Sequence, residues 1–512
     1  MKFLNFVNKG AFGIVYKVEE DNKEYAIKRN FVKSPNFFTS KFREVDIMLK
    51  CKKSKNIVSI KSIYCSNNFN KLFENKIIHS NIKNDKIDDI VHFTMKYAIS
   101  DLSNSINNSN MMNYTLILKD ILLGLRYLHS LSIIHCDLKM NNVLIFEKDG
   151  NYYTKLADFG LAIFNDYNTE FKNFKISCLQ YKSPETLLSY DFDEKLDIWA
   201  FGCIVYEMYT NGKLLYFKQH SKKISNDDMI INQLKYIVNR NYTFRNKKDL
   251  RKFFIENFDI NNIIMNNRRF NNYSELILNK NNEILFDDSF KEELNELLFN
   301  SLHLDYRKRY SANKLLKLDI FNNFKIDKLK NNNIDDIVNI SKNNHRNIIH
   351  EEIIFIMKNN LISWLNIKII IHSIHMFDRL EYLFELNNID IINSIYNKII
   401  LHLKNNEIYK FILHIIFVIF YQYFYIFDVK KTYEQLFPEK YHNKYCKKYA
   451  LNLQKKFFIE ILNYDIYKKT IYEYIMKSDK IKKINIRKIM KIYFEENVNT
   501  LSSFEIVNKY IE

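Results

Sequence analysis

Hydrophobic residues change their spacing several times along the first third of the chain. Up to residue 32, apolar and polar positions alternate in three runs separated by the polar turns "NKG" and "EEDNKE", which predicts three β-strands. Residues 39–50 and 118–128 carry apolar side chains at helical spacing, so each predicts an amphipathic helix. The later apolar runs "NVLIF" and "YTKLA" fit the two strands of a hairpin.

The pattern is different in the last third. The polar stretch "LKNNNIDDIVNISKNNHRN" predicts a linker at residues 326–345. Residues 346–512 contain apolar runs such as "EEIIFIMKNNLISWL", with no strand-like alternation, and predict an all-α domain. The polar, Asn-rich residues 66–91 are expected to be an inserted loop of the first domain, and residues of about 219–295 a larger insert that contains helices.

Composition supports a folded, multidomain chain. The 512 residues are 47% hydrophobic and 15% aromatic, enough to bury the cores of about two or three domains. The formal net charge of +18 could attract nucleic acid or anionic lipid. The lysines are spread along the chain without a dense tract, so we expect no specific nucleic-acid partner.

Cysteine usage and hydropathy indicate an intracellular protein. The six cysteines show no metal-type spacing and fit a reducing compartment. The N-terminal "MKFLNFVNKG" has no apolar signal core. The most apolar stretch, residues 411–427, contains His414 and Gln422 and is shorter than the ~20 residues of a spanning helix. We expect a buried helix there and no membrane partner, with cytoplasm and nucleus left open.

Candidate phosphate-binding groups occur near the N-terminus. Gly10 and Gly13 lie in the "NKGAFG" turn, where bare backbone can approach phosphates closely. Such hairpins are common, so the turn alone indicates little. Lys28 follows in "YAIK", on a strand that is otherwise apolar, and is a candidate phosphate ligand. Glu44, on the next helix, could pair with Lys28; an ordinary solvated glutamate is the alternative reading.

The segment "IIHCDLKMNNVLI", residues 133–145, concentrates further chemistry. Asp137 could accept a proton from an attacking hydroxyl, and Lys139 could neutralise the phosphate that moves. Asn142 offers a carbonyl oxygen to a divalent metal, and Asp158 in "KLADFGLA" offers a carboxylate to the same metal. Hard oxygen ligands of this kind suit Mg²⁺ bridging phosphates. The residues therefore predict a phosphoryl-transfer site.

Together these motifs resemble those of eukaryotic-type protein kinases. "NKGAFGIV", "YAIK", "HCDLKMNN", "DFG", "SPE" and "DIWAFG" occur in the order of that family. The resemblance covers residues 1–325 and implies a bilobal α+β kinase fold. It has a small β-rich N-lobe at 1–95 and a helical C-lobe at 98–325. It also implies that Arg309 pairs with Glu185 of "SPE".

The resemblance implies a Ser/Thr protein kinase that uses ATP and Mg²⁺ and acts on protein substrates. Ser/Thr specificity is suggested by Lys139 two residues after Asp137. The implied catalytic residues are Asp137, Lys139, Lys28 and Glu44, and the implied metal ligands are Asn142 and Asp158. The implied nucleotide-binding residues are Val7, Asn8, Lys9, Gly10, Ala11, Phe12, Gly13, Ile14, Val15, Ala26, Lys28, Met95, Tyr97, Ala98 and Leu144.

Within the family, the chain is most similar to cyclin-dependent kinases, with departures. Asn8 stands at the first glycine of the loop; asparagine tolerates a left-handed backbone, so ATP binding should survive. Cys136 replaces the arginine that grips an activation-segment phosphate, and Asn173 stands at the phosphorylated threonine. We therefore expect activity without that phosphate. Gln180 and Lys182, near the substrate's following residue, make a strict Ser/Thr-Pro preference unexpected.

The C-terminal helices resemble a cyclin box. In "MKNNLISWL", Met357, Leu361 and Trp364 fall at that family's docking groove. This resemblance implies a kinase activated by its own cyclin-like domain, in cis or in a dimer in trans, which would hold Glu44 against Lys28. Two alternatives remain open: an active kinase whose helical tail is an unrelated scaffold or docking module, and a non-catalytic pseudokinase that binds nucleotide.

Overall fold

The computed structural model describes most of the first two thirds of the chain. Outside the described residues lie most of the predicted insert at 219–295, the linker at 326–345 and nearly all of residues 346–512, including the proposed cyclin box. The described residues are 1–10, 13–32, 38–64, 72–73, 88–106, 113–165, 178–187, 192–210, 212–215, 233–234, 237, 292–324, 372–373, 376 and 416.

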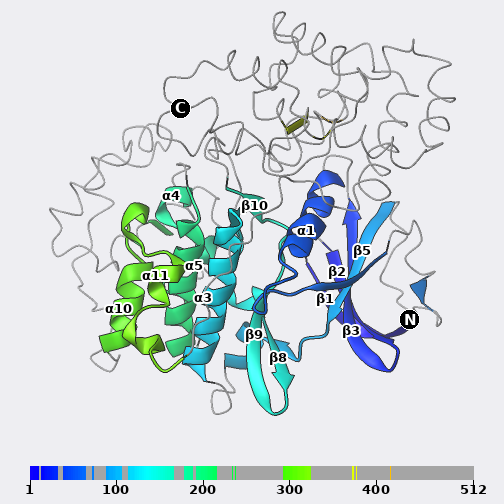
Figure 1. The fold of residues 1–512 in the computed structure, drawn as a ribbon, viewed down its shortest axis with the longest axis horizontal. Helices are drawn as coiled ribbons and strands as arrows, with labels where there is room; N and C mark the ends of the chain where they lie inside the picture. The colour runs from blue at the N-terminus through cyan, green and yellow to red at the C-terminus, as the bar shows by residue number, and fades with distance from the viewer. Residues whose placement is uncertain are drawn as a thin grey trace, which may run out of the picture.

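The N-lobe is a five-stranded antiparallel sheet with helix α1 beside it (Figure 1). The predicted strands are confirmed as β1 (Lys2–Lys9), β2 (Gly13–Glu20) and β3 (Lys23–Val32). The predicted helix is α1 (Phe38–Lys50). Two more strands, β4 (Ile60–Tyr64) and β5 (Asp88–Lys96), complete the order β1-β2-β3-β5-β4.

Alternation along β2 separates the two faces of this sheet. Ile14, Tyr16 and Val18 are buried in one hydrophobic cluster with Ile27 of β3. Their neighbours therefore face the opposite side, because successive side chains of a strand point to opposite faces. On that opposite face Val15 pairs with Lys28. The sheet thus carries a hydrophobic outer layer and presents Lys28 on its inner face.

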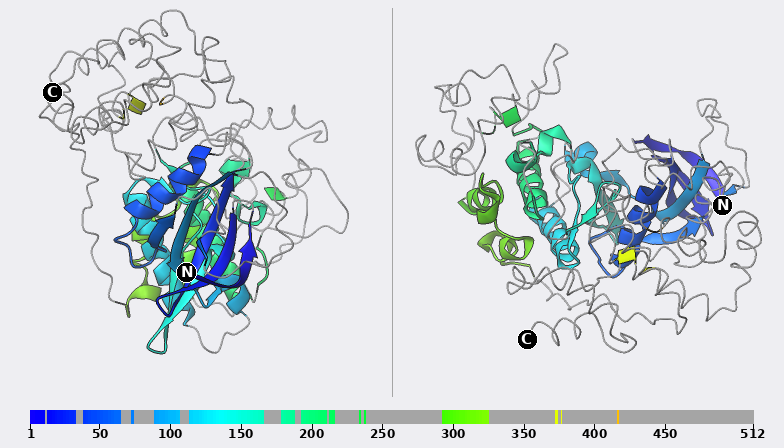
Figure 2. Two further views of the ribbon diagram at one scale, coloured as in Figure 1. Left: turned by 90° about the vertical axis from the view of Figure 1, so that its right-hand side faces the viewer. Right: turned by 90° about the horizontal axis from the view of Figure 1, so that it is seen from above.

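The C-lobe is mainly helical and lies on the other side of the connecting segment, as the three views show (Figures 1 and 2). The central helix α5 (Lys195–Tyr209) is buried along most of its length. Around it pack α3 (Tyr114–Ser130) and α10 (Glu292–Ser301), with α11 (Ala312–Leu315) against both of these. The short helices α2 (Leu102–Ser105) and α4 (Pro184–Leu187) complete the described set.

Small β-elements of the C-lobe face the N-lobe. The predicted hairpin is confirmed as β8 (Val143–Lys148) and β9 (Asn151–Leu156), extended by β6 (Ser100–Asp101). A second pair joins β7 (Ile133–Ile134) to β10 (Ile163–Phe164). The segment after β7 ends in the 3-10 turn η4 (Met140–Asn142), so the polar residues of "HCDLKMNN" lie between two anchored elements.

One predicted boundary was too late. β5 begins at Asp88, inside the stretch expected to be a loop up to residue 91. Its first two residues are polar, which hid the start of the strand from a hydrophobicity pattern. Helix α10 begins at Glu292, near the end of the helical insert expected over about residues 219–295, and packs against α5. Within the described residues, no helix combines the length and apolar character needed to cross a membrane.

Candidate active site

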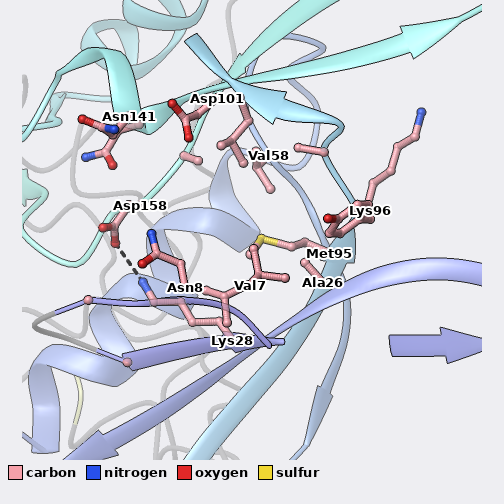
Figure 3. A pocket seen from close by; sticks show the side chains of 18 of the residues that line it. Val7, Asn8, Ala26, Lys28, Val58, Met95, Lys96, Asp101, Asn141 and Asp158 are labelled. Atoms are coloured by element: carbon pink, nitrogen blue, oxygen red, sulfur yellow. Dashed lines mark hydrogen bonds and ion pairs between the residues drawn. The ribbon is translucent and has the colours of Figure 1, made fainter. Parts of the chain in front are cut away.

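Lys28 joins two carboxylates from different elements. Its Nζ donates to Oε1 of Glu44 on α1 at 2.5 Å and to Oδ1 of Asp158 at 2.8 Å. The predicted pairing of Lys28 with Glu44 is therefore confirmed. It arises because Lys28 lies on the inner face of β3, while the middle of α1 presents Glu44. Figure 3 shows the contact between Lys28 and Asp158 at the edge of a cavity.

Lys28 and Asp158 hold each other in their charged forms. Burial alone would lower the pKa of Lys28, but the Asp158 and Glu44 carboxylates raise it above its usual value. Burial would likewise raise the pKa of Asp158, but the Lys28 ammonium beside it lowers that pKa to about 2. At neutral pH the site therefore presents a fixed ammonium and an ionised Asp158 carboxylate.

Asp137 is positioned by hydrogen bonds within its own loop. Its Oδ2 accepts from Lys139 Nζ at 2.7 Å and from Asn142 Nδ2 at 3.1 Å. Asn142 Nδ2 also donates to the Asp137 main-chain oxygen at 2.7 Å. Within the described part of the chain, no group donates a hydrogen bond to Oδ1 of Asp137. This oxygen is free to accept a proton from an incoming hydroxyl.

A buried carboxylate on α5 holds the loop that carries Asp137. Cys136 has a left-handed backbone with φ of 63°, which is costly for a residue with a side chain. Asp197 compensates by accepting from the Cys136 N–H at 3.1 Å and the His135 N–H at 2.8 Å. The Cys136 side chain, in turn, is buried with Ile134 and Phe192 in a hydrophobic cluster.

His135 links this loop to the segment of Asp158. Its Nε2 lies 3.0 Å from the main-chain oxygen of Ala157, and its ring lies against Phe159 with centroids 5.1 Å apart. Asp158 also has a left-handed backbone, with φ of 63°. Two constrained turns are thus joined by one buried imidazole, which fixes Asp137 and Asp158 relative to each other.

These groups border a cavity of about 400 Å³ between the two lobes (Figure 3). One wall comes from the end of β1 and the start of β2, with Val7, Asn8 and Gly13, and from Gly10 between them. Apolar side chains such as Val15, Ala26, Met95 and Leu144 line its other end. The cavity therefore has an apolar end for a flat ring and a charged end at Lys28 and Asp158.

Comparison with known proteins gives the family. Residues 2–321 match the family described as "Protein kinase domain". The chain belongs to the protein kinase family.

Its kinase domain is similar to cyclin-dependent kinases of several organisms. It is 31% identical over 225 residues to "Cyclin-dependent kinase 4 homolog" of Caenorhabditis elegans, covering 43% of this chain and 52% of that protein. It is 29% identical over 223 residues to "Cyclin-dependent kinase 10" of Rattus norvegicus, covering 41% and 55%. The match to "Cyclin-dependent kinase C-1" of Oryza sativa subsp. japonica is 29% over 234 residues, covering 43% of each. The chain thus spans about half the length of these relatives.

The kinase cavity gathers most of the nucleotide-binding residues that the sequence predicted. Asp137 and Lys139 do not line the cavity. Asp137 accepts from Asn142, which does line it, and Lys139 donates to Asp137. The predicted residues in the wall are Val7, Asn8, Gly10, Gly13, Val15, Ala26, Lys28, Glu44, Met95, Tyr97, Ala98, Asn142, Leu144 and Asp158.

Two of the predicted nucleotide-binding residues that the structure describes do not line the kinase cavity. Ile14 is a correction: its side chain packs in the outer cluster with Tyr16, because alternation along β2 turns it away from Val15. Lys9, at the exposed end of β1, does not line the cavity either. Ala11 and Phe12 lie outside the described residues.

Other residues of the kinase cavity were missed. They include Asn141 and Ala157, which flank the predicted Asn142 and Asp158 in sequence, and Val58, whose position depends on tertiary packing. Asp101 could have been found, because it caps α2: its carboxylate accepts from the Asn104 N–H at 3.0 Å. An aspartate that begins a helix beside the cavity also offers acceptor oxygens to a ligand hydroxyl.

The donor set of the kinase site fits Mg²⁺. Among the described residues no group of three or more His, Cys, Asp and Glu side chains could hold a metal by itself. Mg²⁺, however, takes one or two protein oxygens and completes its shell with nucleotide phosphates and water. The Nδ2 of Asn142 donates to Asp137, so the side-chain carbonyl oxygen of Asn142 is available to a metal. The ionised Asp158 supplies the second oxygen donor.

The activation segment of the kinase is anchored as predicted at its far end. Arg309 donates to both carboxylate oxygens of Glu185, at 2.7 and 2.8 Å, which confirms that pairing. Both residues are buried, and the guanidinium lies 4.8 Å from the Trp199 ring centroid. Cys178 donates to Gln180. The residues matching the phosphorylation switch, Asn173 and its neighbours, lie outside the described residues.

Proposed function

We propose that this kinase transfers the γ-phosphate of ATP to serine or threonine hydroxyls of protein substrates. The observation that carries the proposal is the assembly around one cavity of Lys28, Asp158 and the loop of Asp137 and Asn142. Nothing that binds or moves the phosphate is missing from this set. For this reason active catalysis is favoured over a nucleotide-binding pseudokinase.

Each residue has a separate task in the proposed reaction. Lys28, charged and fixed by Glu44, holds the phosphate chain. The free Oδ1 of Asp137 accepts the proton of the substrate hydroxyl as its oxygen attacks. Lys139, which contacts the other oxygen of Asp137, neutralises charge on the phosphate in transfer. Mg²⁺ held by Asn142 and Asp158 would shield the phosphate oxygens.

The test is phosphotransfer to a peptide library with serine, threonine or tyrosine acceptors, using full-length protein, ATP and Mg²⁺. We expect label on serine and threonine and none on tyrosine. Label on tyrosine would contradict the specificity. Absence of label on every acceptor, with ATP still bound, would favour the pseudokinase.

We further propose that the C-terminal region activates the kinase by covering α1. The support lies in the burial of Arg43, Glu44, Val45, Asp46, Ile47 and Met48, each at most 2% exposed. Six consecutive residues span more than one helical turn and thus every face of the helix. A helix with one side on a sheet normally leaves its other side in water. Complete burial therefore calls for a covering segment, and residues 346–512 are the candidate.

The C-terminal region and the kinase domain belong to one chain, which would favour the contact with α1. A flexible connection gives an effective concentration on the order of millimolar. Covering α1 would fix the approach of Glu44 to Lys28, as a cyclin-like domain is expected to do. If the C-terminal region is instead a scaffold or docking module, it does not need to cover α1.

A specific protease site placed within residues 326–345 separates the two alternatives. The full-length protein is purified intact, then cut, and the C-terminal fragment is removed. Activation predicts that phosphotransfer falls on removal and returns when the fragment is added back. Unchanged phosphotransfer after removal would refute activation and favour the docking module.

A further inference from the structure

Asn8 puts a polar side chain where the loop over the cavity would otherwise be bare backbone. The residue belongs to β1, and its side chain points into the cavity, towards the side where Lys28 and Asp158 lie (Figure 3). It is not among the residues with positive φ, so the left-handed tolerance expected from the sequence is not used. The presence of asparagine here therefore calls for another explanation.

An irregularity in β1 brings this side chain to the cavity. The pairing with β2 shifts register between Phe6 and Asn8, so that Phe6 opposes Tyr16 and Asn8 opposes Val15. The extra residue, Val7, breaks the normal alternation, and adjacent residues can then reach the same side. Val7 and Asn8 accordingly both line the cavity.

One hydrogen bond fixes which end of the amide is presented. The Lys9 N–H donates to Asn8 Oδ1 at 2.7 Å, which occupies the carbonyl end. The Nδ2 end is then left with two N–H donors. Gly13 has no comparable freedom, since a Cβ there would lie 2.6 Å from the Arg29 main-chain oxygen. Asn8 is thus a position of this loop where a side chain reaches the ligand space.

We propose that Asn8 Nδ2 donates a hydrogen bond to a phosphate oxygen of the bound nucleotide. The inference rests on the proposed function and adds a neutral donor to the Lys28 ammonium. The end of the cavity that holds Asp158 and Glu44 is rich in negative charge, so an anionic ligand needs donors there. A hydrogen bond to a charged acceptor is among the stronger ones. Asn8 consequently favours nucleotides with a phosphate chain over the nucleoside.

The test compares ATP and adenosine binding to full-length protein by calorimetry, for wild type, Asn8→Leu and Asn8→Asp. Leucine keeps the shape and removes the donors, and aspartate replaces them with a negative charge. We expect ATP affinity to fall about tenfold for leucine and further for aspartate, with adenosine affinity unchanged in both. Thermal unfolding checks that the variants are folded.

Two results would overturn the inference. Wild-type ATP affinity in both variants would show that Asn8 is a tolerated replacement without contact. Equal losses for ATP and adenosine would show a contact with the nucleoside or a change in loop shape. Neither result affects the proposed function, which fails only if the wild type itself does not bind ATP or transfer phosphate.

Discussion

The Nζ of Lys28 lies 2.5 Å from Oε1 of Glu44, and both side chains are buried almost completely. Lys28 on β3 and Glu44 on α1 are 16 positions apart in the sequence. Their contact therefore shows that α1 lies close to the sheet. If the helix moved away, the Lys28 ammonium would lose one of the two carboxylates that position it. The geometry therefore couples the position of α1 to nucleotide binding and phosphate transfer.

We expect Glu44→Gln to lower kcat/KM for ATP by roughly 10- to 100-fold, because a buried ammonium loses one of its two carboxylates. Asp46→Asn is the matched control: it makes the same chemical change on the same helix, where Asp46 pairs with Lys50. Steady-state kinetics at varied ATP concentration measures both. An equal loss in kcat/KM for the two variants would mean that the effect comes from helix stability alone.

Activity should not depend on phosphorylation of the activation segment. The residue at the phosphate-gripping position, Cys136, is buried among Ile134, Ile163 and Phe192 and offers no charge. Phosphatase-treated full-length protein should therefore retain its rate, as measured by transfer to a peptide. Loss of activity on treatment, restored by phosphorylation at Thr169 or Tyr167, would contradict this prediction.

Asn30→Leu should stabilise the protein. Asn30 is 0% exposed, and among the described residues neither its Oδ1 nor its Nδ2 has a hydrogen-bond partner. A leucine of similar shape removes that cost, and we expect the free energy of unfolding to rise by about 1–2 kcal/mol. Asn30→Asp, which buries a charge at the same place, should destabilise. Denaturant unfolding measures both; a destabilised leucine variant would indicate that the amide has a partner after all.

Titration of the Asp193 carboxyl should make the free energy of unfolding fall as pH rises. Burial, with help from Glu194 and Glu185, raises its pKa to about 6 in the folded protein. The unfolded chain, with an ordinary pKa of about 3.9, releases the proton first, so stability is lost between about pH 4 and 6. Asn cannot titrate but can still accept from the Lys195 N–H, which Asp193 does at 2.8 Å.

Asp193→Asn should therefore gain about 2 kcal/mol over wild type at pH 8 and little at pH 4. Denaturant unfolding across this range gives the difference directly. A gain that is the same at both ends of the range would show that the Asp193 carboxyl does not titrate as stated.

The hydrophobic pattern of the sequence was enough to predict the strand and the helix that carry the site residues. It was less successful in predicting the contacts that hold these elements in place. Alternation placed Lys28 on a strand, and helical spacing placed Glu44 on α1, so their pairing could be predicted. The same alternation, applied strictly, would have excluded Ile14 from the cavity. The end of the loop expected at residues 66–91 was placed too late, because β5 begins with polar residues.

Support from distant parts of the chain could not be read from sequence. Asp197 is 62 positions from His135, yet its carboxylate holds the loop of Asp137. No spacing rule connects such residues, because the contact exists only once α5 packs beneath the loop. The register shift that turns Asn8 into the cavity is equally a product of strand pairing. The cyclin-like reading of residues 346–512 stays a prediction.

The most direct test of the account is a single-turnover phosphotransfer assay on full-length wild type and Asp137→Asn, with ATP affinity measured in parallel. The account predicts that the variant binds ATP like wild type but transfers phosphate roughly 10²- to 10⁴-fold more slowly, since it lacks the proton acceptor. Equal transfer rates for the two proteins would contradict it.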